Sequence, residues 1–460
     1  MLAFAGLGRA ATRAAPRTNR LPSQIVHRIA QRSCVDMSDT LFEDIGILVS
    51  GANLGIGSPG PKELATCNQL FAEATQFRIS KEDSTSLFSY GPRSGHPGFR
   101  AQLASFLSKH YGDAVDPDDL MPTGGASQGL TLLTNYYFSS GDVVFVEDAS
   151  YFLALTFFKN DCNMKIISVP TDDGGIIPAE FESLVTQHSK DFRAVTDNKP
   201  FKAMLYTIST YQNPTGRSLD AQRCNDILRV AKANDLLVLS EDVYNLLPFS
   251  QSFRDGDFNS SYVPATEEKV DPSPLRMYHY DRLANSGNPG YGNVVSNCTF
   301  SKILAPGSRL GWMEGSKHVL DPVRRSSFVQ SGGAIQHFMA GIGEALLELG
   351  LQEKQLAHCR QAFENRAKAL CRGFRAHLPS EVVWKPPHGG YFMWLRLPDN
   401  VSGMDVRKAA LKENISLTHG EAFSLEGKFK NYIRVCYTYE EEDTLEKAGE
   451  TIGRIIKDLM

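Results

Sequence analysis

The chain has 460 residues, more than one hydrophobic core usually supports, so we expect at least two packed lobes. Hydrophobic residues make up 42% and charged residues 22%, as in an ordinary soluble globular protein. The 48 basic residues against 52 acidic ones give a net charge of −4, which argues against nucleic-acid binding. No apolar run approaches the roughly 20 residues needed to span a bilayer. The cysteines are scattered without a CxxC pair, so we expect reduced thiols and no metal site.

The N-terminus differs in composition from the remainder of the chain. It is rich in alanine and arginine, and the first acidic residue is Asp36. This composition is typical of a mitochondrial transit peptide, and an unstructured basic tail is the alternative. We therefore expect residues 1–40 to lie outside the fold and the protein to be mitochondrial, or otherwise cytoplasmic.

Two irregular stretches follow. Residues 53–61 are so rich in glycine and proline that no regular period can persist, which predicts a loop. Glycine there, including Gly57, lets a backbone approach a ligand carboxylate closely, although a simple linker is the alternative. Residues 88–98 contain Tyr90 and precede an amphipathic helix expected over residues 99–111. From composition alone, Tyr90 is best interpreted as an ordinary buried aromatic residue.

Residues 123–130, Thr-Gly-Gly-Ala-Ser-Gln-Gly-Leu, open a helix that we expect to end near Phe138. Small residues at a helix start leave amide N–H groups pointing outward, which suits a phosphate. No Gly-Lys-Ser/Thr follows, so this is not a Walker loop. A buried strand is expected over residues 143–146, and Tyr151 comes just past its end, where ligands bind in parallel α/β sheets.

Strands are also expected over residues 203–208 and 236–239, with a helix over residues 220–234 between them. Residues 213–216, Asn-Pro-Thr-Gly, form a turn after the first, and Glu241-Asp242-Val243-Tyr244 follows the second. This alternation predicts right-handed crossovers and a mostly parallel sheet. Residues 251–292 show no period and are expected to be a long excursion between strands.

A strand expected over residues 294–300 leads to Lys302, which lies among Thr299, Ser301 and, seven residues on, Arg309. A lysine near a fixed positive charge and away from water has a lowered pKa, so it is nucleophilic near neutrality. This suits an amine that attacks an aldehyde whose phosphate is held by the arginine, as pyridoxal 5'-phosphate (PLP) requires. A surface lysine beside a paired arginine is the plain alternative.

The C-terminal part is expected to begin with helices and to end as a second α/β unit. A helical region is expected over residues 322–349, and helices over residues 351–378, 403–413 and 441–459. The expected strands cover residues 382–385, 391–397 and 432–436.

Taken in order, these motifs resemble those of the fold-type I PLP-dependent aminotransferases of class I/II, and among them the kynurenine/2-aminoadipate aminotransferase branch. The resemblance spans roughly residues 45–458. It implies an α/β fold like that of aspartate aminotransferase, with a large PLP-binding domain over residues 91–345 built on a mostly parallel seven-stranded sheet. A smaller C-terminal α/β domain would cover residues 346–460. Residues 41–90 would contribute to the small domain and to a homodimer.

The resemblance also implies roles for individual residues. Lys302 would form a Schiff base with PLP and then carry the proton removed from the substrate α-carbon. The phosphate would be held by Arg309, Thr299, Ser301 and the helix start at Gly125, Ala126 and Ser127. Asn213 and Tyr244 would donate to the phenolic oxygen of the cofactor, and Tyr151 would stack on its ring face. Arg434 would bind the α-carboxylate of the substrate, with Asn213 and Gly57 beside it. Tyr90 would reach the phosphate in the neighbouring subunit.

Two positions depart from the family pattern. The carboxylate that pairs with the ring nitrogen is usually an aspartate three residues before the tyrosine, and here that position is Glu241. Asp242 is the alternative if the strand end is shifted, and we favour Glu241. Thr299 stands where serine is usual, so the hydroxyl is kept.

The implied activity is a ping-pong exchange of an amino group between an L-α-amino acid (aromatic, 2-aminoadipate-like or broad) and a 2-oxo acid such as 2-oxoglutarate. The alternatives are a PLP-dependent lyase of the aminocyclopropane-carboxylate synthase type and a non-catalytic PLP-binding protein. A PLP-binding transcriptional regulator would need a DNA-binding domain before the fold, and the roughly 45 preceding residues are too few. We expect small-molecule substrates, a homodimer, and neither nucleic-acid nor membrane partners.

Overall fold

The computed structural model describes residues 51–81, 84–259, 276–288, 290–332 and 335–460. The predicted transit peptide and the first part of the predicted N-terminal segment lie outside the described residues. Among the helices of the described residues, none combines the length and the apolar character that crossing a membrane requires.

A seven-stranded sheet forms the centre of the larger part, with strand order β2-β10-β9-β8-β7-β3-β4. Strand β10 is antiparallel to both of its neighbours, and all other pairs are parallel. This confirms the predicted mostly parallel sheet. The bounds are β2 Leu120–Thr123, β3 Val143–Glu147, β4 Lys165–Val169, β7 Ala203–Thr207, β8 Leu236–Glu241, β9 Val294–Thr299 and β10 Gly311–Gly315.

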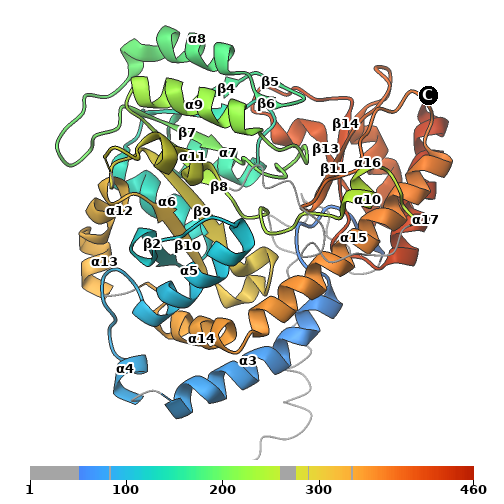
Figure 1. Ribbon diagram of the computed structural model, residues 1–460. Coiled ribbons are helices and arrows are strands. Elements are labelled where there is room, and N and C mark those ends of the chain that lie inside the picture. The colour runs from blue at the N-terminus through green and yellow to red at the C-terminus, as the bar shows by residue number, and fades with distance from the viewer. Residues whose placement is uncertain (1–50, 82–83, 260–275, 289, 333–334) are drawn as a thin grey trace, which may run out of the picture. The chain divides into compact units, whose positions relative to one another are not determined.

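Helices cover both faces of this sheet (Figure 1). In β3, Val143 and Phe145 pack into one hydrophobic cluster, whereas Val144 and Val146 pack into another. A strand that is apolar on both faces needs cover on both sides, as is usual in parallel sheets. The first cluster includes α8 (Pro178–His188), α9 (Ala221–Ala233) and α11 (Met277–Ala284), and the second includes α5 (Pro97–Tyr111), α6 (Ala126–Tyr137) and α14 (His337–Glu348).

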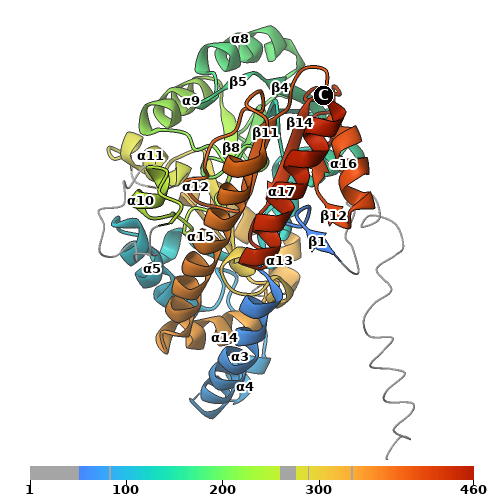
Figure 2. The same ribbon diagram turned by 90° about the vertical axis from the view of Figure 1, so that its right-hand side faces the viewer.

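The C-terminal part carries a three-stranded antiparallel sheet of order β11-β14-β13. Helix α17 lies alongside the long helix α15 (Figure 2). Glycines permit the close approach, because a Cβ on Gly373 would lie 2.5 Å from the Glu446 carbonyl oxygen. The bounds are β11 Phe392–Arg396, β13 Thr418–His419, β14 Tyr432–Cys436, α15 Leu351–His377, α16 Gly403–Lys412 and α17 Glu442–Leu459.

The start of the described chain joins this C-terminal part. Strand β1 (Ala52–Asn53) pairs in parallel with β12 (Ile415–Ser416). Helix α3 (Pro61–Lys81) then leads to α4 (Ser84–Phe88). This pairing places residues 52–53 with the C-terminal part, while the domain bounds and the role of residues 41–90 in a homodimer stay predictions. The remaining short elements are β5 Thr171–Asp172, β6 Gly175–Ile176, α7 Phe152–Thr156 and α10 Gln251–Arg254.

One predicted element was wrong, and two predicted regions contain more elements than the sequence indicated. The helical region expected over residues 322–349 consists of α12 (Lys317–Arg324), α13 (Ser327–Gly332) and α14, and Gln336 adopts a left-handed φ of 55° directly before α14. The strand expected over residues 382–385 is only a single bridge between Val383 and Arg396, and two prolines follow it. The excursion expected over residues 251–292 does lie between two strands of the sheet, β8 and β9, and its described residues also contain the helices α10 and α11.

Candidate active site

The candidate site lies at the carboxyl ends of four adjacent parallel strands. Lys302 follows β9, Glu241 ends β8, Asn213 follows β7, and Tyr151 follows β3. Parallel strands end at the same edge of a sheet, so these side chains are brought together there. Arg434 lies in the middle of β14 and reaches the same place from the C-terminal sheet.

Lys302 lies at the end of a single helical turn, Phe300–Lys302, that directly follows β9. The Thr299 side chain caps this turn by accepting a hydrogen bond from the Ser301 amide at 3.1 Å. The Lys302 Nζ donates to the Gly57 carbonyl oxygen at 2.7 Å. The Tyr391 hydroxyl donates to the Lys302 carbonyl oxygen at 2.7 Å, which fixes the backbone that carries the amine.

The Lys302 amine is activated mainly by burial. Burial lowers the pKa of Lys302 to about 8, with the positive charges of Arg434 and Arg309 acting in the same direction and the negative charge of Glu241 opposing them. The sequence predicted both a neighbouring positive charge and removal from water as causes, and removal from water is the larger of the two. A pKa near 8 leaves an appreciable fraction of neutral, nucleophilic amine at neutral pH.

Glu241 is a buried carboxyl group with two donors. The Tyr206 hydroxyl donates to Oε2 at 3.1 Å, and Asn297 Nδ2 donates to Oε1 at 2.9 Å. Burial raises the pKa of Glu241 to about 7, while the two donors and the charge of Lys302 act against this rise. Asn297 Nδ2 also donates to the Ala126 carbonyl oxygen at 2.8 Å, so one amide ties Glu241 to the start of α6.

Asp242 points away from this group. Its Oδ1 accepts hydrogen bonds from the hydroxyls of Ser209 at 2.6 Å and Ser240 at 2.8 Å. Successive side chains at the end of a strand face opposite sides, so only one of the two carboxylates can face Lys302. The geometry favours Glu241 over Asp242 as the partner of a ring nitrogen.

A set of donors suited to a phosphate dianion surrounds the start of α6. Gly125 precedes the helix with φ 87° and supplies no side-chain cap, so the first-turn amides, including those of Ala126 and Ser127, are left for a ligand. Arg309 lies beside Gly125 and donates to the Gly124 carbonyl oxygen at 3.2 Å. The hydroxyls of Thr299 and Ser301 lie 2.9 Å apart in the neighbouring turn.

We predict that Gly125→Ala weakens the binding of a phosphate-bearing cofactor about tenfold or more. The added Cβ would lie 2.8 Å from the Arg309 guanidinium and would displace it. Gly141→Ala is a matched control, because Gly141 has φ 88° and nothing within 4 Å of its Cβ position. Titration of the apoproteins with PLP measures both; equal affinities for the two variants would contradict the assignment.

Arg434 is buried and already oriented. It donates to Asn213 Oδ1 at 2.9 Å, to the Gly55 carbonyl oxygen at 2.5 Å and to Thr418 Oγ1 at 3.2 Å. The guanidinium carbon lies 4.2 Å from the centre of the Phe392 ring. Within the described residues, its buried Nε has no hydrogen-bond partner. The buried Arg434 guanidinium therefore offers hydrogen-bond donors and a positive charge to a carboxylate.

Arg434 also determines which way the Asn213 amide faces. An arginine can only donate, so the Asn213 atom that it contacts must be the oxygen. The Asn213 amide nitrogen is therefore left to donate to another group. Tyr244 is buried, and its ring centre lies 5.9 Å from that of Phe392, the ring that Arg434 also contacts. Burial raises the Tyr244 pKa well above the ordinary value, so the hydroxyl stays protonated and able to donate.

Tyr151 and Tyr90 have contrasting positions. Tyr151 lies directly before α7, and burial raises its pKa to about 12, with the negative charge of Glu241 acting in the same direction and Arg434 opposing both. The Tyr90 side chain is 85% exposed, so the prediction of a buried aromatic from composition alone was wrong. Exposure is compatible with the contact to a second subunit that the resemblance implies.

Several residues that support the site were missed by the sequence analysis. They are Tyr206, Asn297, Gln212, Tyr391, Thr418 and Gly55. Gln212 adjoins the Asn-Pro-Thr-Gly turn that was singled out, and Gly55 lies within the glycine-rich segment 53–61, so a local signal was available for these two. The others bond to partners far away in the chain, which a single sequence does not disclose.

Comparisons with known proteins agree with the resemblance. A family model described as aminotransferase class I and II matches residues 50–452. The chain is 25% identical over 410 residues to aromatic-amino-acid aminotransferase 1 of Thermococcus litoralis, covering 89% of this chain and 88% of that protein. It is 25% identical over 418 residues to 2-aminoadipate transaminase of Thermus thermophilus, covering 90% and 91%. The solved structure of Pyrococcus horikoshii kynurenine aminotransferase has a TM-score of 0.74 and 26% identity, covering 94% of this chain and 98% of that one.

Proposed function

Because the chain belongs to the class I and II aminotransferase family, we propose that it transfers the amino group of an L-α-amino acid to a 2-oxo acid through bound PLP. The observation that carries the proposal is the position of the Lys302 amine, whose pKa is lowered to about 8. It lies near Glu241, which Asn297 links to the phosphate-binding donors at the start of α6. The names of its relatives support an aromatic, 2-aminoadipate-like or broad amino-acid donor and an acceptor such as 2-oxoglutarate.

The residues present fit PLP. Bound PLP supplies an aldehyde that bonds reversibly to amines and a protonated pyridine ring that accepts the electron pair left when the α-proton departs. A Cβ at Gly125 would collide with the Arg309 guanidinium, so Arg309 can lie beside the start of α6 only because residue 125 is a glycine. Glu241, whose pKa is raised to about 7 by burial, would hold the proton on the ring nitrogen.

Lys302 would act twice. Its neutral amine would hold the cofactor, and its Nζ would accept the proton from the substrate α-carbon. The hydrogen bond from Nζ to Gly57 holds the amine at the carboxyl ends of the strands. Arg434 would bind the α-carboxylate, and Asn213, with its oxygen engaged by Arg434, would direct its amide nitrogen at the phenolic oxygen.

An absorbance titration tests this function. The purified protein is mixed with a panel of aromatic, acidic and aliphatic L-amino acids, and its cofactor spectrum is followed. We expect conversion to the pyridoxamine form with the preferred amino acids and return with 2-oxoglutarate. Product formed without any 2-oxo acid would instead indicate a lyase, and bound PLP that no amino acid converts would contradict the proposal.

We predict that Arg434→Lys raises KM for the amino acid between about 10-fold and 100-fold with a smaller change in kcat. A lysine keeps the charge but loses the paired donors that match a carboxylate. Arg366→Lys is the matched control, since Arg366 is also buried and donates to Glu63 at 2.7 Å outside the site. Steady-state kinetics measures both variants, and an unchanged KM in Arg434→Lys would contradict the assignment.

We also propose a homodimer with shared sites. The support is an exposed group of aromatic residues around Tyr90, in which Phe88 is 65% exposed and stacks on Phe338 with ring centres 5.6 Å apart. Tyr90 would reach the phosphate in the second subunit. Mixing Lys302→Ala with Tyr90→Ala subunits should then produce activity above that of either variant, because one site of each mixed dimer is intact. No gain in activity, with a dimer measured by sedimentation, would reject shared sites.

Mitochondrial import is likewise a proposal, supported by the arginine-rich, acid-free composition that precedes Asp36. Residues 1–45 fused to a fluorescent reporter should direct it to mitochondria, and the same segment with its arginines replaced by alanine should not. A cytosolic wild-type fusion would reject the proposal.

A further inference from the structure

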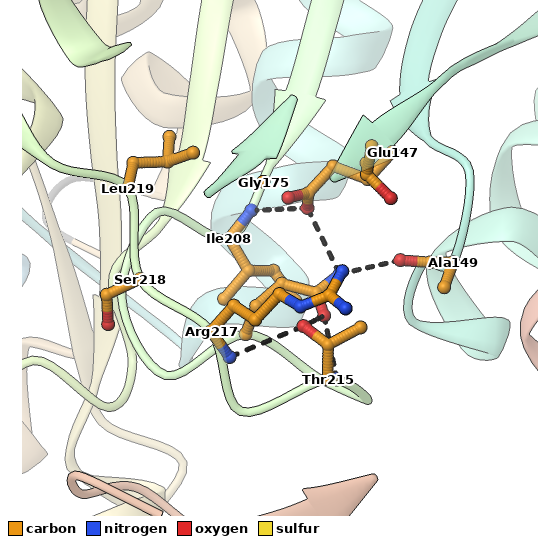
Figure 3. A pocket seen from close by; sticks show the side chains of 10 residues that line it. Glu147, Ala149, Gly175, Ile208, Thr215, Arg217, Ser218 and Leu219 are labelled. Atoms are coloured by element: carbon orange, nitrogen blue, oxygen red, sulfur yellow. Dashed lines mark hydrogen bonds between the residues drawn. The ribbon is translucent and has the colours of Figure 1, made fainter. Parts of the chain in front are cut away.

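A buried polar network of Glu147 and Gln212 lies next to the site, beside the turn that contains Asn213. Glu147 ends β3 and Gln212 precedes Asn213, and both side chains are buried. Glu147 Oε2 accepts hydrogen bonds from the Ile208 amide at 3.0 Å and from Gln212 Nε2 at 3.2 Å. Figure 3 shows the Glu147 carboxylate directed at the Ile208 amide, with Ala149 and Thr215 close by.

Gln212 uses its complete hydrogen-bonding capacity in this network. Its Nε2 donates to Glu147 and, at 2.6 Å, to the Ala149 carbonyl oxygen. Its Oε1 accepts from the Thr215 amide at 2.9 Å and from the Thr215 hydroxyl at 2.7 Å. A side-chain amide has two donor hydrogens and two acceptor positions, so every one is engaged. No carboxylate, hydroxyl or apolar side chain of this length could replace it.

The network joins two segments that carry site residues. Ala149 lies two residues before Tyr151, and Thr215 lies two residues after Asn213. The main chain of Gln212 closes the turn as well, because the Gly216 amide donates to the Gln212 carbonyl oxygen at 2.6 Å. One side chain therefore fixes the Asn213 turn against the loop that leads to Tyr151.

We propose that Gln212, held by Glu147, is a positioning residue that aligns Asn213 and Tyr151 for the cofactor ring and, through Asn213, orients Arg434 for the substrate carboxylate. This rests on the proposed transaminase function for its catalytic consequence. The mechanical part, which is the coupling of the two segments, does not depend on activity.

Kinetics of Gln212→Met provide the first test. Methionine has a similar volume and removes all four hydrogen bonds. We expect KM for the amino acid to rise about tenfold, and PLP affinity to fall by a similar factor. Gln355→Met is the matched control, because Gln355 is equally buried and donates to the Glu63 carbonyl oxygen at 3.0 Å outside the site. It should lose thermal stability without a change in KM, and a tenfold rise in both variants would overturn the proposal.

Conservative and double variants decide whether the effect passes through Asn213. Glu147→Met removes the acceptor for two donors and should raise KM as Gln212→Met does, whereas Glu147→Gln keeps an oxygen acceptor and should restore most of the wild-type value. In an Asn213→Ala background, Gln212→Met should change KM less than twofold, since the residue that it positions is gone. A full tenfold effect in that background would overturn the positioning role.

Hydrogen exchange of the apoprotein tests the coupling independently of catalysis. Gln212→Met should speed amide exchange in peptides covering residues 208–218 and residues 147–155 together, and Gln355→Met should change neither. Faster exchange in only one of the two segments, or in none, would overturn the coupling. If the wild-type protein proves inactive as a transaminase, the proposed function fails, but the exchange result still decides the coupling.

Discussion

Replacing Lys302 by alanine is expected to lower kcat/KM for transamination by at least about 10⁴-fold while leaving the fold intact. The variant loses both the amine that bonds the cofactor and the group that accepts the α-proton. Structurally, the side chain gives up its hydrogen bond to Gly57 and its contact with the Tyr391 ring, 5.6 Å from Nζ, while the hydrogen bond from the Tyr391 hydroxyl goes to the main chain, which alanine retains. Because the pKa of Lys302 is lowered to about 8 from 10.5, its charged form is disfavoured in the folded state. The apo variant should therefore be at least as stable as the wild type below pH 8.

Borohydride reduction of the holoenzyme identifies the reactive lysine directly. We expect the reduced cofactor on the peptide that contains Lys302, and no label in Lys302→Ala. Lys317→Ala is a suitable control, since Lys317 is exposed at the start of α12. A label on another lysine, or a complete reaction cycle in Lys302→Ala, would contradict the assignment of the central residue.

The residues that the sequence identified share one property. Lys302, Asn213 and Glu241 each follow or end an apolar strand of the central sheet, so the hydrophobic pattern placed them at one edge. Once the strands were assigned, the parallel arrangement alone brought these groups together.

The supporting residues could not be predicted in this way, because their contacts depend on distant parts of the chain. Gln212 bonds Ala149, which lies 63 residues earlier, and Asn297 bonds Glu241, which lies 56 residues earlier. Each is a polar side chain within or beside a strand, where a pattern of apolar and polar residues indicates only an interruption. Their hydrogen bonds are satisfied only in the folded sheet.

Helix α3 was missed for a different physical reason. Its buried face is formed by Glu63, Cys67, Ala74 and Arg78, whose spacing is helical but whose side chains include two charges. Those charges are paired across the fold, with Arg78 donating to Glu344 at 2.6 Å. Hydrophobic periodicity cannot detect a helix that buries ion pairs.

The second large effect is expected at Glu241. Glu241→Gln should lower kcat/KM by about 10²-fold to 10³-fold, because an amide cannot hold the proton on the ring nitrogen. Tyr206 and Asn297 hold the carboxylate at the position that a glutamate side chain reaches. Glu241→Asp keeps the carboxylate but shortens the side chain, so it should be more active than Glu241→Gln and less active than the wild type. Asp242→Asn keeps an oxygen for Ser209 and Ser240 and should stay close to wild-type activity. The reverse order, with Asp242→Asn more damaging than Glu241→Gln, would assign the ring partner to Asp242.

The stability of the apoprotein gives Glu241 a signature that is separate from catalysis. Burial raises the pKa of Glu241 to about 7 from 4.5, so the folded state binds this proton more tightly than the unfolded chain does. The stability that the proton contributes is complete below pH 4.5 and is lost as pH rises through 7. The shift of the Glu241 pKa from 4.5 to about 7 corresponds to roughly 3 kcal/mol in the free energy of unfolding, and Glu241→Gln removes this contribution to the pH dependence of stability. Denaturant unfolding at pH 5 and pH 8 should therefore show a smaller loss of stability in the variant than in the wild-type apoprotein. Equal losses would mean that Glu241 ionises freely, and a carboxylate with ready access to water could not serve as the buried partner of the ring nitrogen.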